Sequence, residues 1–218
     1  MRRDRTACPG VVLASASPRR RELLTSIGLR FEVRAVAVDE SVRLGESPEE
    51  HVLRLALEKA RASGEPGELV LGADTVVVLD GEILGKPRDR EDARRMLGLL
   101  EGREHRVLTG VALREVASER SAVAVAASDV RLRPLDAEEI AWYVTTGEPS
   151  DKAGAYALQG VGGLFVDSIR GSSSNVIGLP LGVVYELFPE LGYDLRDFRC
   201  EAPIDPAPLR TLDTLPPS

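Results

Sequence analysis

The sequence predicts an α/β protein built on a mixed β-sheet. Short β-branched segments alternate along the chain with segments whose apolar residues recur at helical spacing. Two long strand-like segments, 106–116 and 122–132, are joined by a polar turn, so the sheet should contain an antiparallel hairpin. We expect one folded domain at 11–196 between an arginine-rich tail at 1–10 and a proline-rich tail at 197–218.

Local signals justify the individual elements. The pairs Ser17-Pro18 and Ser47-Pro48 supply a capping hydroxyl and a residue pre-organised for the first helical turn, so each should begin a helix. Asp80-Gly81 is a hairpin turn signal. In chain order we expect strand 11–14, helix 17–28, strand 31–38, helix 47–64, strands 69–71 and 76–79, helix 89–100, strands 106–116 and 122–132, helix 136–145, strand 164–169 and helix 181–191.

The composition excludes several classes of function. With 28 basic and 35 acidic residues the net charge is −7, which disfavours binding to nucleic acid or to an acidic membrane.

No apolar run approaches the roughly 20 residues of a membrane span, and the N-terminus carries no signal-peptide core, so we expect a cytoplasmic protein. Cys8 and Cys200 form no metal or redox motif, and only two histidines are present. Carboxylate oxygens would therefore hold any required metal, which suits Mg²⁺ or Mn²⁺.

Lysine is rare in this arginine-rich chain, occurring only at Lys59, Lys86 and Lys152. Lysine carries a compact point charge on rotatable donors, whereas arginine presents a fixed planar fork, so a crowded phosphate or metal site can accept only lysine. Each lysine also lies in a constrained local context, such as the turn 85–87. The alternative is that they are three leftover surface residues.

Two further motifs have the residue types of a phosphate or metal site. Ser15 and Arg20 flank a strand-to-helix junction, where free backbone N–H groups attract phosphate, although an ordinary helix start would look the same. Asp74 is expected at the C-terminal edge of an apolar strand, where open α/β sheets bind ligands, or it is a turn aspartate. Glu40 follows the second strand and offers more carboxylate oxygen, unless it is simply solvated.

Taken together, the motifs resemble those of the Maf family over about residues 11–192. They are 13–20 (LASASPRR), 58–60 (EKA), 72–75 (GADT), 86–88 (KPR), 151–156 (DKAGAY) and 178–181 (GLPL). The resemblance implies nucleoside triphosphate pyrophosphatases related in fold to inosine triphosphatases, with an elongated mixed β-sheet flanked by helices and two lobes with a central cleft. It also implies a divalent metal cofactor, Mg²⁺ or Mn²⁺, a nucleoside triphosphate substrate and a homodimer.

The resemblance also assigns roles to residues. It implies that Asp74 is the catalytic carboxylate, that Glu40 helps it to hold the metal, and that cationic and hydroxyl side chains bind the polyphosphate. With the lysine argument added, the expected substrate-binding residues are Ser15, Arg20, Lys59, Lys86 and Lys152.

Base preference can be inferred from three positions. Arg19, Thr75 and Gln159 resemble the branch of the family that hydrolyses dTTP and UTP, and the amide of Gln159 suits the O4 and N3–H edge of a pyrimidine. The alternatives are a pyrophosphatase for 7-methyl-GTP and a non-catalytic, nucleotide-sensing regulator of cell division. His51, expected on a helix surface, and His105, expected at a strand edge, receive no functional role.

Overall fold

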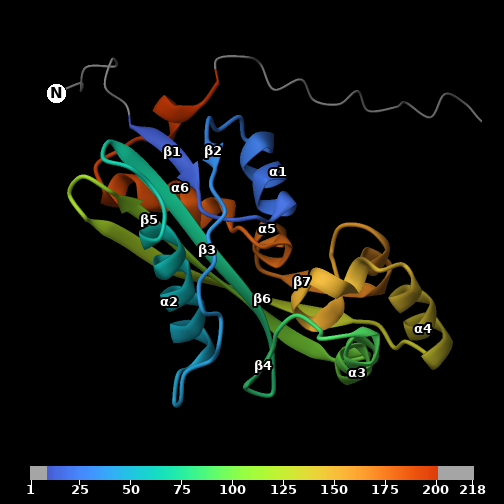
Figure 1. The fold of residues 1–218 in the computed structure, drawn as a ribbon. Coiled ribbons are helices and arrows are strands. Elements are labelled where there is room, and N and C mark those ends of the chain that lie inside the picture. The colour runs from blue at the N-terminus through green and yellow to red at the C-terminus, as the bar shows by residue number, and fades with distance from the viewer. Residues whose placement is uncertain (1–8, 201–218) are drawn as a thin grey trace, which may run out of the picture.

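One twisted sheet runs through the computed structural model, which describes residues 9–200 (Figure 1). The sheet has the strand order β2-β1-β3-β5-β6-β7, with β4 paired to β3. β1 is parallel to β2 and β3, whereas the pairs β3–β5, β5–β6 and β6–β7 are antiparallel, so the sheet is mixed as expected. The predictions for residues 1–8 and 201–218 lie outside the described residues.

Helices and strands alternate along the described chain. Their bounds are β1 Gly10–Leu13, α1 Pro18–Ser26, β2 Glu32–Val33, α2 Pro48–Arg61, β3 Glu68–Leu79, β4 Glu82–Leu84, α3 Arg90–Leu100, β5 Glu104–Glu115, β6 Ser121–Leu132, α4 Ala137–Thr145, β7 Val166–Arg170, α5 Ser173–Ile177 and α6 Leu181–Glu190. Four short 3-10 segments are labelled η in the described residues: η2 Glu148–Asp151, η3 Ala153–Ala155, η4 Val161–Phe165 and η5 Leu195–Phe198.

Three expectations about strands are wrong. The expected strand 31–38 is only Glu32–Val33, because β1 is four residues long and offers partners to just these two residues. The expected pieces 69–71 and 76–79 are one continuous strand, β3, whose twelve residues pass straight through the motif 72–75. The segment expected as strand 164–169 begins instead with η4, and strand pairing starts at Val166.

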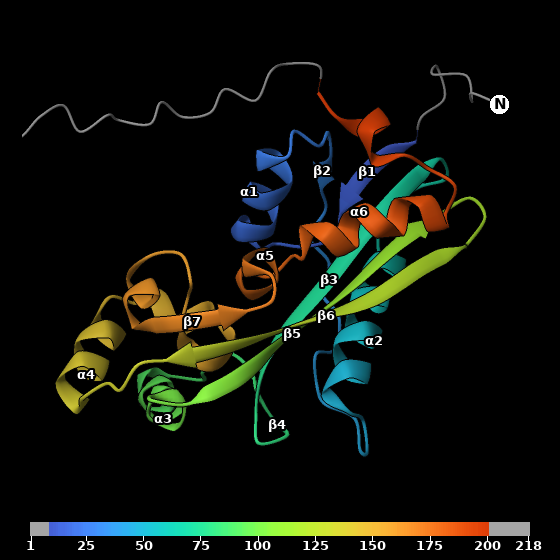
Figure 2. The same cartoon turned by 180° about the vertical axis from the view of Figure 1, so that it is seen from behind.

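Two glycines let α2 lie directly on the sheet. A Cβ atom at Gly72 of β3 would be 2.1 Å from the carbonyl oxygen of Ala56, and one at Gly110 of β5 would be 2.2 Å from that of Val52. Only glycine permits this approach of helix and strand backbones. α2 therefore covers one face of the long strands, while α6 covers the other face (Figures 1 and 2).

The long strands connect two hydrophobic cores. At one end the residues around Leu71 pack with α1 and α6, including Phe188. At the other end the residues around Val77 pack with α3 and α4, including Leu97 and Tyr143. These two ends form the two lobes expected from the resemblance (Figure 2). Within residues 9–200, no helix has the length and apolar character required to cross a bilayer.

Candidate active site

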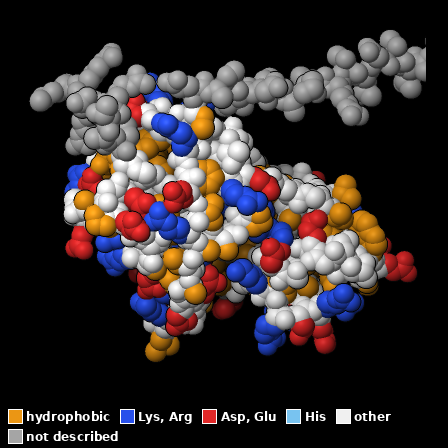
Figure 3. All heavy atoms as spheres, turned by 45° about the horizontal axis from the view of Figure 1, so that its top comes forward, with side chains coloured by type: hydrophobic (Ala, Val, Ile, Leu, Met, Phe, Trp, Pro, Cys, Tyr) orange, Lys and Arg blue, Asp and Glu red, His pale blue; other side chains and the backbone are white. Residues whose placement is uncertain are grey.

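A pocket of about 560 Å³ lies between the two lobes, within the range of about 300–1,000 Å³ usual for small-molecule sites. Basic side chains lie between the lobes in the space-filling view (Figure 3). The pocket lining contains every site residue that the sequence predicts: Ser15, Arg19, Arg20, Glu40, Lys59, Asp74, Thr75, Lys86, Lys152 and Gln159.

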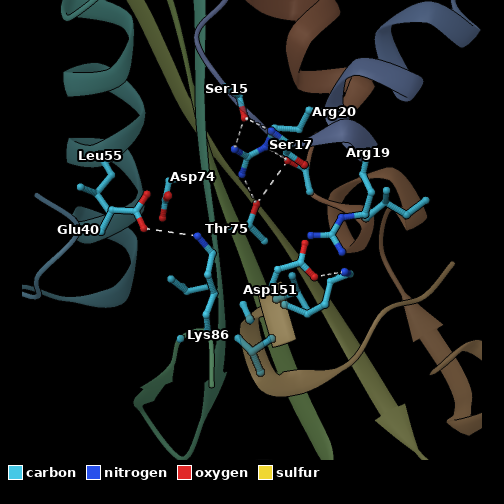
Figure 4. Close-up of a pocket in the computed structure, with 18 of the residues that line it drawn as sticks. Ser15, Ser17, Arg19, Arg20, Glu40, Leu55, Asp74, Thr75, Lys86 and Asp151 are labelled. Atoms are coloured by element: carbon cyan, nitrogen blue, oxygen red, sulfur yellow. Dashed lines mark hydrogen bonds and ion pairs between the residues drawn. The ribbon is translucent and has the colours of Figure 1, made fainter. Parts of the chain in front are cut away.

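The pocket opens along an unpaired edge of β3. β1 stops pairing with β3 at Leu71, and β4 begins to pair only at Val77, so residues 72–76 have a strand partner on one side only. Successive residues of a strand point to opposite faces, and Asp74 and Thr75 therefore lie on the two sides of this edge (Figure 4). The expectation that Asp74 ends a strand is wrong, because it lies inside β3.

On the α2 side of the edge, one ammonium group joins two carboxylates. Lys59 Nζ donates hydrogen bonds to Asp74 Oδ1 at 2.7 Å and to Glu40 Oε1 at 2.6 Å. Lys59 and Asp74 are both buried, whereas the side chain of Glu40 is about half exposed. Such charge-assisted bonds hold both carboxylates in place and balance part of their charge.

Glu40 reaches this cluster from the irregular segment between β2 and α2. Partial burial alone would raise the pKa of Glu40, but the hydrogen bond and charge of Lys59 outweigh it, with help from Lys86. The net result is a pKa below the ordinary value. Lys86 Nζ lies 3.7 Å from Glu40 Oε2, and its side chain is exposed enough to turn toward a ligand.

On the opposite side, Arg20 is buried among neutral acceptors. Its guanidinium donates from Nε to the Gly178 carbonyl at 2.8 Å, from Nη1 to Ser15 Oγ at 3.0 Å and from Nη2 to Thr75 Oγ1 at 3.0 Å (Figure 4). Burial lowers the pKa of Arg20, and the charge of Asp74 opposes this effect. No carboxylate pairs with Arg20 in the described chain, so a buried positive charge borders the pocket.

Besides the two sides of the β3 edge, the pocket is lined by residues of α1 and of the segment 151–159. Arg19 has a buried Nε atom with no hydrogen-bond partner among the described residues. Burial lowers the pKa of Arg19, and Asp151 partly offsets the shift. Lys152 is paired with Asp151, and Gln159 is exposed at the pocket wall.

The residues present fit a hard divalent cation that is shared with a substrate. Glu40 and Asp74 bring carboxylate oxygens to the same ammonium group, and within residues 9–200 no cluster of three or more His, Cys, Asp or Glu could hold a metal unaided. Mg²⁺ is commonly bound by one or two carboxylates together with substrate phosphates. These two side chains could therefore hold such an ion.

Sequence reasoning missed the burial of both histidines. His51 is buried and lines the pocket, with Nδ1 3.1 Å from Glu46 Oε2. His105 is also buried, with Nε2 2.8 Å from the hydroxyl of Tyr156, another pocket residue. A signal for His51 was present, because it lies four and eight residues before Leu55 and Lys59, on one helix face.

Comparison with known proteins gives a consistent result. The family described as Maf-like protein matches residues 10–191. A protein of Anaeromyxobacter sp. (strain Fw109-5) named dTTP/UTP pyrophosphatase is 59% identical over 188 residues, covering 85% of this chain and 91% of that protein. Proteins of the same name from Symbiobacterium thermophilum and Myxococcus xanthus are each 52% identical over 187 residues, covering 85% of this chain and 95% and 94% of their own lengths.

Proposed function

The chain belongs to the Maf-like protein family, and we propose that it is a nucleoside triphosphate pyrophosphatase that cleaves dTTP and UTP to the nucleoside monophosphate and pyrophosphate. The names of relatives that cover most of this chain support the proposal. The observation that carries it is the placement of Asp74, Glu40 and Lys59 at an open strand edge inside a pocket large enough for a nucleotide.

The pocket has the charge required to hold a triphosphate. Five basic side chains but only three carboxylates line it, although the chain as a whole carries a net charge of −7. α1 begins at the pocket after Ser17, whose side chain makes no capping bond, so the first backbone N–H groups of the helix are available to an anion. Preorganised cations of this kind stabilise charge that grows on the phosphoryl oxygens.

We propose that Asp74 accepts a proton from water. Its Oδ1 accepts a hydrogen bond from Lys59, while Oδ2 has no hydrogen-bond partner among the described residues. A water oxygen would bond to the α-phosphorus as the bond from that phosphorus to the α–β bridging oxygen breaks. Pyrophosphate leaves with the bridging oxygen, and the proton of the water passes to Asp74 Oδ2.

We propose that Glu40 and Asp74 hold a Mg²⁺ or Mn²⁺ ion when the substrate binds. The ion would supply charge neutralisation at the polyphosphate. Lys59 holds both carboxylates in place through its two hydrogen bonds, and the lowered pKa of Glu40 supports the role of Glu40 as a metal ligand. Chelation with EDTA should abolish turnover, and added Mg²⁺ or Mn²⁺ should restore it.

Base preference is proposed to depend on Arg19, Thr75 and Gln159. Thr75 Oγ1 is already engaged by Arg20 and lies 2.9 Å from Thr109 Oγ1, so its contribution is to hold Arg20. Gln159 lies at the pocket wall and is exposed to a ligand. Its amide can pair with the O4 and N3–H groups of uracil or thymine.

A nucleotide panel with product identification tests the proposal. Purified protein with Mg²⁺ should release pyrophosphate from dTTP and UTP faster than from dCTP or 7-methyl-GTP. Asp74→Asn should abolish release while nucleotide binding persists. Asp80→Asn makes the same chemical change at an exposed hairpin position and should leave the rate unchanged.

Other outcomes of the panel would replace the proposal. Orthophosphate as the only product would indicate a different reaction, and binding without hydrolysis would favour a nucleotide-sensing regulator. Faster cleavage of 7-methyl-GTP than of dTTP would favour the second branch of the family. We also propose a cytoplasmic homodimer, as the resemblance implies, and light scattering of the purified chain tests the dimer.

A further inference from the structure

The carboxylate of Glu148, outside the pocket lining, is bound entirely by neutral donors. Glu148 begins η2, and its Oε1 accepts hydrogen bonds from the Tyr143 hydroxyl at 2.8 Å and from Gly162 N at 3.0 Å. Its Oε2 accepts a hydrogen bond from Val161 N at 3.0 Å. Within residues 9–200 no basic side chain comes within salt-bridge distance of it, although its charge acts on Arg19 from further away. Hydrogen bonds to an ionised acceptor are among the stronger ones in proteins.

These bonds close a loop around the segment 157–162. The Tyr143 hydroxyl, which donates to Glu148, also accepts a hydrogen bond from Ala157 N at 3.2 Å. The pair Tyr143–Glu148 therefore holds the segment at both ends, at residue 157 and at residues 161–162. Gln159 lies between these anchors and lines the pocket together with residues 157 and 158.

The glycine-rich stretch that starts at Gly160 fits this carboxylate. Gly160 has φ +101°, and a Cβ atom there would be 2.4 Å from Glu148 Oε2. A Cβ atom at Gly162 would be 2.6 Å from the Tyr143 hydroxyl oxygen. Side chains at either position would keep the backbone from wrapping around the carboxylate. This stretch is thus a cradle for an internal anion.

Tyr143 provides a rigid support for the arrangement. It is fully buried, and its ring meets that of Phe165 edge to face, with centroids 5.0 Å apart. Burial raises the pKa of Tyr143, and the hydrogen bond to Glu148 adds to the shift, so the phenol stays protonated and can donate. The carboxylate is therefore held on one side by a fixed core residue and on the other by the segment that carries Gln159.

We infer that Glu148 is a positioning residue for base selection, which acts by fixing the pocket wall that carries Gln159. It does not touch the polyphosphate-binding residues, so its influence should fall on the base and not on the phosphates. This inference rests on the proposed function, because it assumes that the base of a nucleotide lies against Gln159.

Glu148→Gln tests the inference with an isosteric change. The amide would present an N–H group where a backbone N–H or the phenol now donates, so at least one donor loses its acceptor and the segment shifts. We expect the ratio of kcat/KM for dTTP over dCTP to fall by about tenfold, mainly through a higher KM for dTTP. Glu186→Gln, an exposed change on α6, is the matched control and should leave the ratio unchanged.

Inorganic tripolyphosphate separates positioning from general damage. It carries no base, so its inhibition constant should be the same in wild type and Glu148→Gln. A parallel rise in that constant would mean that the whole site is distorted and would overturn the inference. If Glu148→Gln does not fold, Tyr143→Phe removes one donor to the same carboxylate and should lower the dTTP/dCTP ratio in the same direction.

A double-mutant cycle tests whether Glu148 acts through Gln159. In a Gln159→Ala background, Glu148→Gln should change the dTTP/dCTP ratio no further, because the group that it positions is absent. Additive losses would overturn the inference. Failure of the proposed function is distinguishable, since wild type would then release no pyrophosphate from dTTP, whereas failure of the inference alone leaves an active Glu148→Gln with an unchanged ratio.

Discussion

Replacing Gly72 by alanine should displace the proposed catalytic cluster of Asp74, Glu40 and Lys59 without changing any charged residue. The added Cβ atom would lie 2.1 Å from the carbonyl oxygen of Ala56 and 2.8 Å from the backbone nitrogen of Ala60. Both atoms belong to the backbone of α2, so no side-chain rotation relieves the clash. To reach an ordinary contact of 3.4 Å, helix and strand must separate by about 1.3 Å.

That separation is large compared with the geometry of the site. Lys59 precedes Ala60 on α2, and its bonds to Asp74 and Glu40 measure 2.7 and 2.6 Å. Moving the helix away from β3 lengthens the bond between Lys59 and Asp74 beyond hydrogen-bonding distance. A misplacement of about 1 Å can cost about 100-fold in rate, so we expect kcat for dTTP to fall by about that factor. Overpacking should also remove about 1–3 kcal/mol of stability.

Pyrophosphate release and thermal unfolding measure the two effects. A loss of 1 kcal/mol should lower Tm by about 2–4 °C in a chain of this size. Gly98→Ala is the matched control, since its Cβ atom on α3 would meet no atom within 4 Å. Because alanine favours a helix over glycine, this control should gain about 0.5–1 kcal/mol and keep full activity. Wild-type Tm and turnover in Gly72→Ala would refute the reasoning.

Three further changes address the surroundings of the cluster. Lys59→Arg should lower kcat about 100-fold or more, because a planar guanidinium cannot replace one compact charge between two carboxylates. The loss of kcat should be smaller for Lys86→Arg, because the side chain of Lys86 is exposed. Equal losses of kcat in the two variants would contradict this prediction. Arg54 donates to the Ser41 carbonyl at 3.0 Å, next in sequence to Glu40, the proposed metal ligand. Arg54→Ala should therefore raise the Mg²⁺ concentration for half-maximal activity about tenfold. An unchanged requirement in a metal titration would argue against this prediction. Burial lowers the pKa of His105 to about 4. In the unfolded chain the same imidazole binds a proton already at about pH 6.5, so protonation favours unfolding. The free energy of unfolding therefore falls as the pH drops from about 6.5 to about 4. His105→Gln should remove up to about 3 kcal/mol of this pH dependence in urea unfolding, and an unchanged slope would contradict it.

Local signals were sufficient for much of the fold. Ser17 and Ser47 precede helices that start at the expected prolines, and Asp80-Gly81 forms the expected turn between β3 and β4. Each signal acts through atoms within a few residues of itself: Ser47 caps its helix, Pro18 fixes φ in the first turn although Ser17 makes no capping bond, and Gly81 permits a positive φ. Such effects are the same in any fold, which is why the sequence alone predicts them.

The position of Asp74 could not be predicted in the same way. A small, polar motif between two apolar runs looks like the end of one strand and the start of another. In the structure, Gly72 lies against α2 and Asp74 bonds to Lys59 on the same helix, so the strand continues through the motif. The deciding partner is a helix more than ten residues away in sequence, and a local pattern carries no information about such a contact.

The register of β3 determines which face receives the carboxylate. A slip of one residue would exchange Asp74 and Thr75 between the two faces of the sheet, and a buried cation lies on each side. The polar pattern alone is therefore compatible with either register of β3. Steric contact with α2 excludes the shifted register, because the shift would bring a side chain to the place of Gly72, where a Cβ atom would lie 2.1 Å from the helix backbone. Gly110, opposite Asp74 on β5, imposes the same condition on the neighbouring strand. The geometry of the proposed active site thus depends on two positions that carry no functional group.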